Sequence, residues 1–396
     1  MLWFSLSQIS LLFLIIIGGL SFVKKTSWAQ ILAGLLSLLL ILQVSSLYLS
    51  GGLIDYRFIE HANLRDISIG IGQFIPQFFL GIGLWGILTF VSYKMSRWLR
   101  QRPASKTYVL GLIVICFVLL SIKGGMLSSL FEVVELKSTQ SQSFQQSLEK
   151  LGISAQDYLE QDKIEAQAGK NVIILSLESM ERSLLHDNLA QLSPELRKLS
   201  KQYTFIPMAE MPGSDWTQGS LYTFLTGIPF FFGGNREKVF EQAEATLINS
   251  LPLIFNKAGY EQLYIMGKPE FSATDRLLEI LGIEVLSEKD IPEEYPSSPW
   301  GLHDVDLFTE LKKAALDFHK NNKPFALYAS TISTHWPDGI YDGRMEALIE
   351  KEDQPLAFSI KALDYLIGNF MAYLEENGIL ENTVVYIFPD HKFMQT

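Results

Sequence analysis

Side chains that could activate a hydroxyl group are spread over the C-terminal two-thirds of the chain. Asp390 and His391 follow the apolar run 384–388, and a carboxylate beside an imidazole at a strand end is a common way to present two metal ligands. Glu178 ends another apolar run, and Thr217 follows the turn-forming residues Pro-Gly-Ser-Asp. A threonine hydroxyl is a poor nucleophile by itself. A divalent cation held by Glu178 and the Asp-His pair could lower the pKa of Thr217 and neutralise charge on an attacked phosphoryl group.

Each of these residues also has an ordinary structural explanation. A glutamate after a strand is usually a solvated loop residue, and many Asp-His pairs hold no metal. Thr217 would fit a helix N-cap, as would Ser214 or Asp215. The combination favours a metal site with oxygen ligands and one imidazole, which suits Mn²⁺ or Mg²⁺ and does not exclude Zn²⁺. If Thr217 begins a helix, free N–H groups and the helix dipole would also stabilise an anion.

The elements that must position these side chains alternate along the chain after residue 170. Strand-like apolar runs cover 172–177, 262–266, 325–330 and 383–388, and helical patterns cover 189–201, 217–226, 247–258, 274–281, 304–321 and 356–376. This alternation predicts an α/β domain with a mainly parallel sheet, covered on both faces. Ligands gather at the carboxyl ends of strands in such sheets. Glu178, His335 and the Asp390-His391 pair all follow predicted strands, so we expect them at one rim.

The first 123 residues are a different kind of sequence. The chain of 396 residues is 48% hydrophobic, and the excess lies in four stretches, 2–23, 28–53, 67–93 and 107–122. Each is near the ~20 residues that cross a bilayer as a helix, the fourth being the shortest. A cleaved signal peptide would explain only the first stretch, which lacks a basic start. We therefore predict about four transmembrane helices.

Basic residues in the short loops predict the orientation of these helices. Lys24 and Lys25 follow the first stretch, and the loop at 94–106 between the third and fourth carries five Lys or Arg residues. Such loops stay in the cytoplasm. With four spans, both termini lie outside. The sequence thus predicts a multi-pass protein of the cell membrane whose polar C-terminal part is extracytoplasmic.

The composition of the chain predicts how its domains are organised and which binding partners are excluded. We expect a membrane domain at 1–123, a Gln- and Ser-rich juxtamembrane linker at 124–170 and a catalytic domain at 171–396. The only cysteine, Cys116, lies in the fourth stretch, so the exported part has no disulfide and no cysteine ligand or nucleophile. The net charge of −11 argues against nucleic acid as a partner, because phosphate backbones select basic surfaces.

Five segments resemble motifs of the membrane-anchored phosphoglycerol transferases of the alkaline phosphatase/sulfatase superfamily. Residues 171–182, which include Glu178, look like the first strand of that family. Pro212-Gly-Ser-Asp-Trp-Thr217, with Gly227-Ile-Pro229, resembles the nucleophile segment, most closely that of enzymes that modify periplasmic glucans. Lipoteichoic acid synthases are more distant relatives. Trp300-Gly-Leu-His-Asp304 and Thr334-His-Trp-Pro-Asp-Gly339 also look like family motifs.

The resemblance implies a set of site residues. One divalent ion, Mn²⁺ or Mg²⁺ before Zn²⁺, would be bound by Glu178, Thr217, Asp390 and His391. Thr217 would also be the nucleophile. His335 matches a family histidine beside the substrate phosphate and glycerol, where it would stabilise charge or donate a proton to the leaving group. Weaker candidates for lining the substrate pocket are Trp300, His303 and Asp304.

The resemblance further implies that the enzyme moves phosphoglycerol from a phosphatidylglycerol-like lipid to an extracytoplasmic glycan, through a phospho-threonine. The alternative is phosphoethanolamine transfer on the same fold, although those relatives usually carry disulfides in the exported domain. A sulfatase activity is disfavoured because no Cys/Ser-x-Pro-x-Arg pattern occurs near Thr217. An inactive membrane protein is the third possibility. Relatives continue well past the Asp-His pair, so we expect a C-terminally truncated chain whose sheet is incomplete.

Overall fold

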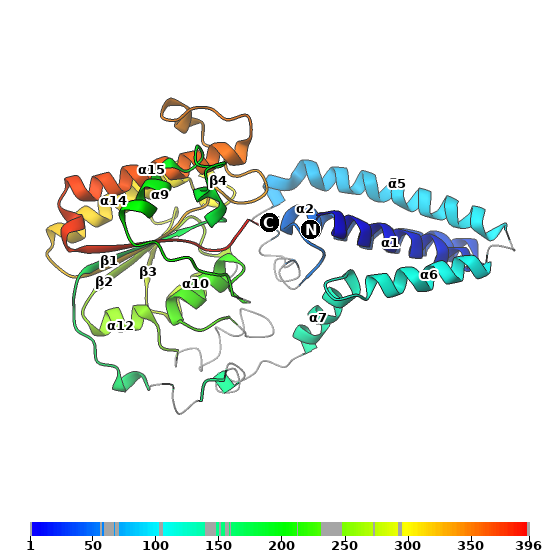
Figure 1. Cartoon of the computed structure of the whole chain (residues 1–396), viewed down its shortest axis with the longest axis horizontal. Helices are drawn as coiled ribbons and strands as arrows, with labels where there is room; N and C mark the ends of the chain where they lie inside the picture. The colour runs from blue at the N-terminus through cyan, green and yellow to red at the C-terminus, as the bar shows by residue number, and fades with distance from the viewer. Residues whose placement is uncertain are drawn as a thin grey trace. The chain divides into compact units, whose positions relative to one another are not determined.

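The computed structural model divides the chain into two compact units, Met1–Ser138 with Met394–Thr396, and Thr139–Phe393 (Figure 1). It describes residues 2–393 except for 56–57, 59–66, 68–70, 103–105, 139–147, 150–151, 155–157, 159, 212, 231–247, 272–273 and 292–294. Pro212, which opens the motif before Thr217, and part of the predicted linker therefore lie outside the described residues.

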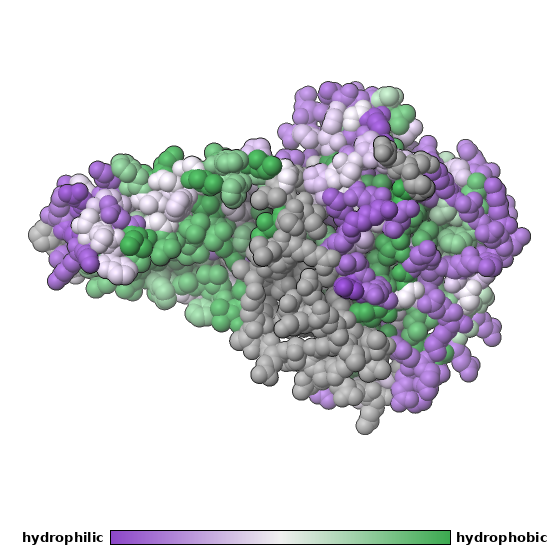
Figure 2. All heavy atoms as spheres, turned by 180° about the vertical axis from the view of Figure 1, so that it is seen from behind, coloured by the Kyte–Doolittle hydropathy of each residue, from purple (hydrophilic) through white to green (hydrophobic). Residues whose placement is uncertain are grey.

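The first unit consists of apolar helices. Among its described residues, three helices are long and apolar enough to cross a membrane: α1 (Leu2–Ser21), α2 (Thr26–Ser50) and α5 (Ile75–Arg100). The fourth predicted span forms α6 (Lys106–Leu120), whose 15 residues extend only about 22 Å, less than the ~30 Å of a hydrocarbon core. Helix α1 packs against α2, α5 and α6, and apolar side chains cover the outer surface of the unit (Figure 2). A shorter helix, α7 (Met126–Ser138), follows α6.

The second unit is built on a five-stranded parallel sheet in the order β3-β2-β6-β1-β7. Its strands are β1 (Asn171–Leu177), β2 (Glu261–Ile265), β3 (Glu284–Leu286), β6 (Phe325–Ser330) and β7 (Thr383–Pro389). Strand β1 lies between β6 and β7, with Ser176 opposite both Ser330 and Phe388. The carboxyl ends of these three strands are therefore level, and the loops that follow them start at the same rim.

Helices cover both faces of this sheet (Figure 1). One face carries α9 (Pro194–Gln202), α14 (Asp304–Lys320) and α15 (Pro355–Glu376), and the other carries α10 (Thr217–Thr226) and α12 (Leu251–Lys257). The core on the α14 and α15 side is aliphatic and aromatic, with members such as Leu175, Leu327, Phe308 and Phe370. Remaining elements are α13 (Thr274–Ile280), a β4–β5 hairpin (Ser297–Ser298 and Gly301–Leu302), and the single turns η1 (Ile71–Phe74), η3 (Gln161–Lys163), η4 (Arg182–Leu185), η7 (Gly343–Ala347) and η8 (Ile379–Asn382).

The predicted α/β fold with a mainly parallel sheet is confirmed, and each of the four predicted strands is present. The helix predicted at 189–201 begins only at Pro194, because residues 182–192 form a single 3-10 turn and further turns. Proline is favoured at this first helical position, where its missing N–H costs nothing. Strand β3 and the β4–β5 hairpin were not predicted, since both are too short to show a pattern.

Candidate metal centre

The ends of β1 and β7 bring together three groups that could hold a metal ion. Glu178 directly follows β1, and Asp390 and His391 directly follow β7. One ligand atom from each residue lies within 4.8 Å of the others. All three are buried, with 5%, 6% and 4% of their surface exposed. The structure thus places the predicted carboxylates and imidazole at one point of the rim.

Thr217 completes this cluster from the other side of the rim. It is the first residue of α10, and its Oγ1 lies 3.4 Å from Glu178 Oε2 and 3.5 Å from His391 Nε2. Its hydroxyl therefore faces the cluster. Trp216 occupies the N-cap position, and its side chain makes no capping hydrogen bond to the first N–H groups of α10. An anion beside Thr217 would find both these N–H groups and the helix dipole.

Two glycines shape the turn that presents Thr217. Gly213 has φ +87°, which side chains other than glycine rarely adopt, and a Cβ there would lie 2.7 Å from the Phe230 carbonyl oxygen. A Cβ on Gly219 would lie 2.3 Å from the Gly213 carbonyl oxygen. The first turn of α10 therefore packs directly against the backbone of the preceding loop, which fixes where Thr217 begins the helix.

Hydrogen bonds orient each ligand before any ion binds. Asp390 Oδ1 accepts from the backbone N–H of Ser179 at 2.8 Å and of His391 at 2.7 Å. Ser179 Oγ donates to Glu178 Oε1 at 2.6 Å. His391 Nδ1 lies 2.8 Å from the Lys392 carbonyl oxygen, to which only a protonated Nδ1 can donate. A neutral His391 therefore directs the lone pair of Nε2 toward the other ligands, as metal-binding histidines do.

The electrostatics of the cluster favour a bound cation. Burial, and then the neighbouring Glu178 carboxylate, raise the pKa of Asp390 to about 7. Burial lowers the pKa of His391, but the carboxylates of Asp390 and Glu178 outweigh it and the net shift is upward. Two buried carboxylates this close repel each other unless a positive charge lies between them. Carboxylate oxygens with one imidazole fit Mn²⁺ or Mg²⁺, and the arrangement is compatible with Zn²⁺.

His335 lies in the loop after β6, against an aromatic side chain. Its ring stacks on Trp300 with centroids 4.3 Å apart and planes at 25°, and Trp300 in turn meets Phe271 edge-on. His335 Nδ1 lies 2.8 Å from the Trp336 carbonyl oxygen. Burial lowers the pKa of His335 to about 4, so the ring is neutral near pH 7. In that state Nδ1 donates to Trp336, and Nε2 can only accept a proton or a hydrogen bond.

Asp304 holds the backbone of the same loop. Its Oδ1 accepts from the N–H of Ile332 at 2.8 Å, and its Oδ2 accepts from the N–H of Ser333 at 3.1 Å. Burial raises the pKa of this carboxyl to about 6. The neighbouring His303 has its Nδ1 3.7 Å from Asp342 Oδ2. Of the three weaker candidates, Trp300 therefore contacts His335 directly, whereas Asp304 supports the loop that carries it.

Several supporting residues were not predicted from the sequence. Thr331 Oγ1 accepts from the backbone N–H of Glu178 at 3.0 Å, and Thr334 Oγ1 donates to the Glu178 carbonyl oxygen. Arg344 forms a bidentate ion pair with Asp306 on α14. Thr331 and Thr334 could have been predicted from the sequence as supporting residues, because they closely follow the end of a predicted strand. Arg344 could not, since its partner is 38 residues away.

The domain is thus a parallel α/β sheet that carries at its rim a threonine beside a buried Glu, Asp and His cluster, a group of side chains that could hold a metal ion. Residues 170–394 match the Sulfatase family, so the chain belongs to that family. This agrees with the resemblance drawn from the motifs around Glu178, Thr217 and His335.

Among curated relatives, the Phosphoglycerol transferase I of Xanthomonas axonopodis pv. citri is 25% identical over 240 residues, which are 57% of this chain and 34% of that protein. The enzyme of the same name from Escherichia fergusonii is 22% identical over 394 residues, or 94% of this chain and 49% of that protein. The chain thus spans between a third and a half of these relatives. The lipoteichoic acid synthase LtaP of Listeria monocytogenes is a structural neighbour with a TM-score of 0.48 and 20% identity, covering 63% of this chain and 62% of LtaP.

Proposed function

We propose that the protein transfers phosphoglycerol from a phosphatidylglycerol-like lipid to a glycan outside the cytoplasm, with Thr217 as the nucleophile. The observation that carries this proposal is the position of Thr217 Oγ1, 3.4 Å from Glu178 and 3.5 Å from His391 in a buried ligand cluster. The curated relatives named Phosphoglycerol transferase I support the nature of the transferred group.

The residues that would hold the divalent ion are Glu178, Thr217, Asp390 and His391. When bound, the ion would lower the pKa of the Thr217 hydroxyl and offset negative charge on the phosphoryl oxygens. In the first displacement, Thr217 Oγ attacks the lipid phosphorus. The Oγ–P bond forms as Thr217 gives up its hydroxyl proton, and the bond from phosphorus to the diacylglycerol oxygen breaks. Diacylglycerol leaves after taking up one proton, which balances the proton lost from Thr217. The N–H groups at the start of α10 would stabilise the phosphoryl oxygens during this step.

The second displacement returns Thr217 to its hydroxyl form. A glycan hydroxyl attacks the phosphorus of phospho-threonine, its O–P bond forms, and the Oγ–P bond breaks. We propose that the neutral His335 accepts a hydrogen bond from the attacking hydroxyl at Nε2 and so orients it, because its Nδ1 donates to Trp336. The proton of that hydroxyl passes to Thr217 Oγ as the Oγ–P bond breaks. The proton donation expected from the family resemblance needs a protonated ring, which burial disfavours. Trp300 would fix the plane of the imidazole through their stacked contact.

The apolar helices support a lipid donor and a membrane location. A headgroup attached to two acyl chains stays at the bilayer surface, so an enzyme that uses it gains from being anchored there. The basic residues at 24–25 and 94–106, which lie at or between helix ends, support an extracytoplasmic position for the second unit. A glycan outside the cytoplasm is the acceptor class that this location offers.

Mass spectrometry of the trapped enzyme tests the proposal. The full chain in lipid nanodiscs with Mn²⁺ would be incubated with phosphatidylglycerol carrying an isotope-labelled headgroup, in the absence of acceptor. We expect a phosphoglycerol adduct on Thr217 and release of diacylglycerol. An adduct on Ser214 or Ser220 would contradict the assignment of the nucleophile. Labelling only from phosphatidylethanolamine would instead identify a phosphoethanolamine transferase.

A further inference from the structure

An exposed apolar strip leads into the candidate metal centre. Each residue from 201 to 211 is exposed, from the last two residues of α9 to the turn that presents Thr217. Five large apolar side chains point outward there: Tyr203, Phe205, Ile206, Met208 and Met211. Ile206 and Met208 each have 69% of their surface exposed. Within the described part of residues 139–393, these five are the majority of the nine exposed large hydrophobic residues. Such clustering marks a contact surface rather than scattered exposure.

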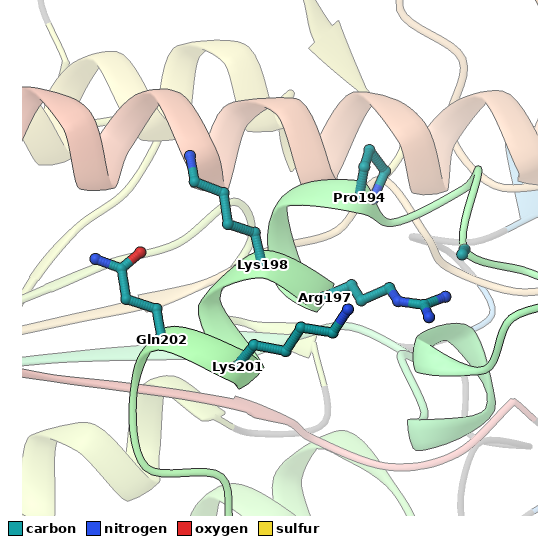
Figure 3. A pocket seen from close by; sticks show the side chains of 6 residues that line it. Pro194, Arg197, Lys198, Lys201 and Gln202 are labelled. Atoms are coloured by element: carbon teal, nitrogen blue, oxygen red, sulfur yellow. The ribbon is translucent and has the colours of Figure 1, made fainter.

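Cationic side chains flank the strip at its start. Helix α9 borders a hollow of 590 Å³ lined by Ala190, Pro194, Arg197, Lys198, Lys201 and Gln202. Arg197 and Lys201 extend to one side of α9 and Gln202 to the other (Figure 3). Arg197 pairs with Asp187, and Lys198 lies 3.4 Å from Glu195. Exposed pairs of this kind are weak, so the cations can exchange these partners for phosphate groups.

Contacts at both ends connect the strip to its neighbours. At the start, Gln202 in the hollow lies 3.4 Å from the hydroxyl of Tyr203. At the end, Glu210 accepts from the backbone N–H of Lys392 at 3.1 Å and pairs with its ammonium group at 3.3 Å. Lys392 directly follows the candidate ligand His391. The strip therefore runs from a cationic hollow to the edge of the metal centre, and its one carboxylate is already paired.

We propose that residues 197–211 dock the second unit onto a lipid bilayer that contains anionic headgroups. Cations beside exposed aromatic and aliphatic side chains are the composition that binds the membrane interface. The apolar residues would enter the acyl boundary, and Arg197, Lys198 and Lys201 would meet the phosphates. A protein with net charge −11 needs a local cationic surface of this kind to approach an anionic bilayer.

The bilayer is favoured over a protein partner because the chain itself keeps it close. The same polypeptide carries three helices able to cross a membrane, so the second unit always lies near a bilayer surface. A polypeptide partner would have to compete with this high local concentration of lipid. The inference goes beyond the proposed transfer reaction and holds whichever group Thr217 accepts.

Site-specific fluorescence in nanodiscs tests the docking without any turnover. Cys116 would be replaced by alanine, and a single cysteine would be placed at Met208 for labelling with a small fluorophore. The control label is placed at Leu348, an equally apolar residue that is 52% exposed and lies elsewhere in the second unit. We expect quenching by lipids with a shallow doxyl group to be at least about threefold greater at 208 than at 348, because interfacial segments lie ~5–10 Å deep.

The possible results distinguish between anionic lipid, solvent and a polypeptide as what contacts the strip. Lipid quenching at 208 that weakens in the Lys198→Glu, Lys201→Glu variant, and weakens in zwitterionic nanodiscs, supports docking on anionic lipid. Equal quenching by aqueous iodide at 208 and 348, without lipid quenching, would overturn it in favour of a solvated surface. Protection of position 208 from both quenchers would overturn it in favour of a covering polypeptide. Bound Mn²⁺ in each labelled variant reports that the unit is folded.

Discussion

The backbone N–H of Ser179 donates to Asp390 Oδ1 at 2.8 Å and so joins the carboxyl ends of β1 and β7. Asp390 N–H in turn donates to the Leu177 carbonyl oxygen at 3.0 Å. Ser179 reaches this position with φ +48°, an uncommon value for serine. These bonds form when the two strands pair, so the ligand geometry is a property of the fold. An ion that binds there meets ligands that are already oriented.

Removing the metal should therefore destabilise the second unit without unfolding it. Chelation leaves the carboxylates of Glu178 and Asp390 buried together, so we expect a lower thermal midpoint and retained secondary structure. At an ion concentration of 100 times Kd, the bound ion contributes about 2.7 kcal/mol to the free energy of unfolding. Circular dichroism during thermal melting, with and without EDTA, measures both the thermal midpoint and the secondary structure that remains after chelation.

The variant Glu178→Gln should reverse its effect with the metal. Without the ion it removes one of two repelling carboxylates, so we expect it to melt above the wild type. With excess Mn²⁺ it lacks a ligand, so we expect it to melt below the wild type. The exposed Glu350→Gln provides a control for loss of a charge. An equal loss of stability in Glu178→Gln with and without the ion would show that Glu178 is only structural.

Removing the hydroxyl of Thr217 should abolish transfer. We expect Thr217→Ala to lose at least about 10³-fold in kcat, since nucleophile removal leaves only binding and electrostatic contributions. Thr217→Ser keeps the hydroxyl and should keep measurable activity and the adduct. Because Thr217 is half-buried at the first position of α10, the melting temperature of the metal-free alanine variant should be close to that of the metal-free wild type. Release of labelled diacylglycerol measures the rate, and normal activity of the alanine variant would exclude a phospho-threonine.

The convergence of the metal-centre residues could be predicted because each marks the boundary of an element. Glu178 and Asp390 end apolar runs, and Thr217 begins a helical pattern after a glycine turn. Because β1 and β7 are neighbouring parallel strands with Leu177 opposite Pro389, the residues that follow them lie close together. The same reasoning did not predict β3, because its three residues are too few to form a recognisable apolar pattern. It predicted the fourth apolar helix, α6, but a pattern of apolar residues does not show that only 15 of them are helical.

The role of Asp304 could not be predicted, because its partners are backbone groups. Its carboxylate accepts from N–H groups 28 and 29 residues away, and any residue type would supply those donors. A sequence shows which side chains could do chemistry but not which backbone amides lie within their reach. The resemblance to a family motif suggested that Asp304 lines the substrate pocket. In the structure, Asp304 instead holds the backbone of the loop that carries His335.

Weakening that support should lower turnover through the position of His335. In Asp304→Asn the amide nitrogen cannot accept, so the N–H of Ile332 or Ser333 loses its partner, at a cost of about 1–3 kcal/mol in stability. A shift of about 1 Å in a positioned group can cost ~10²-fold in kcat, and we expect a loss of that order.

Mn²⁺ affinity distinguishes this effect from damage to the metal centre. It should remain that of the wild type, since Glu178, Asp390 and His391 are not bonded to Asp304. The exposed Asp317→Asn, on the same helix, is the matched control. Loss of metal binding together with turnover in Asp304→Asn would contradict a positioning role.

Asp364 should make the stability of the second unit depend on pH. Its carboxylate accepts from the N–H groups of Glu195 and Leu196, both at 2.8 Å, at the start of α9. Burial raises its pKa from 3.8 to about 6. The folded state therefore binds the proton more tightly than the unfolded state, and this contribution to stability is lost as pH rises from about 4 to about 6. A shift of about two pKa units corresponds to about 3 kcal/mol.

The variant Asp364→Asn is uncharged at every pH and isolates this contribution. Its amide nitrogen cannot accept from one of the two N–H groups, so we expect the variant to carry a loss of stability that does not depend on pH. Between pH 4 and pH values above 6, its melting temperature relative to the wild type should rise by about 5–10 °C, because 3 kcal/mol corresponds to a shift of this size in a domain of a few hundred residues. Melting both proteins across this range in one detergent removes pH effects that they share. A constant difference between the two curves would mean that Asp364 titrates alike in the folded and unfolded states, and that α9 is held by the uncharged geometry of the cap alone.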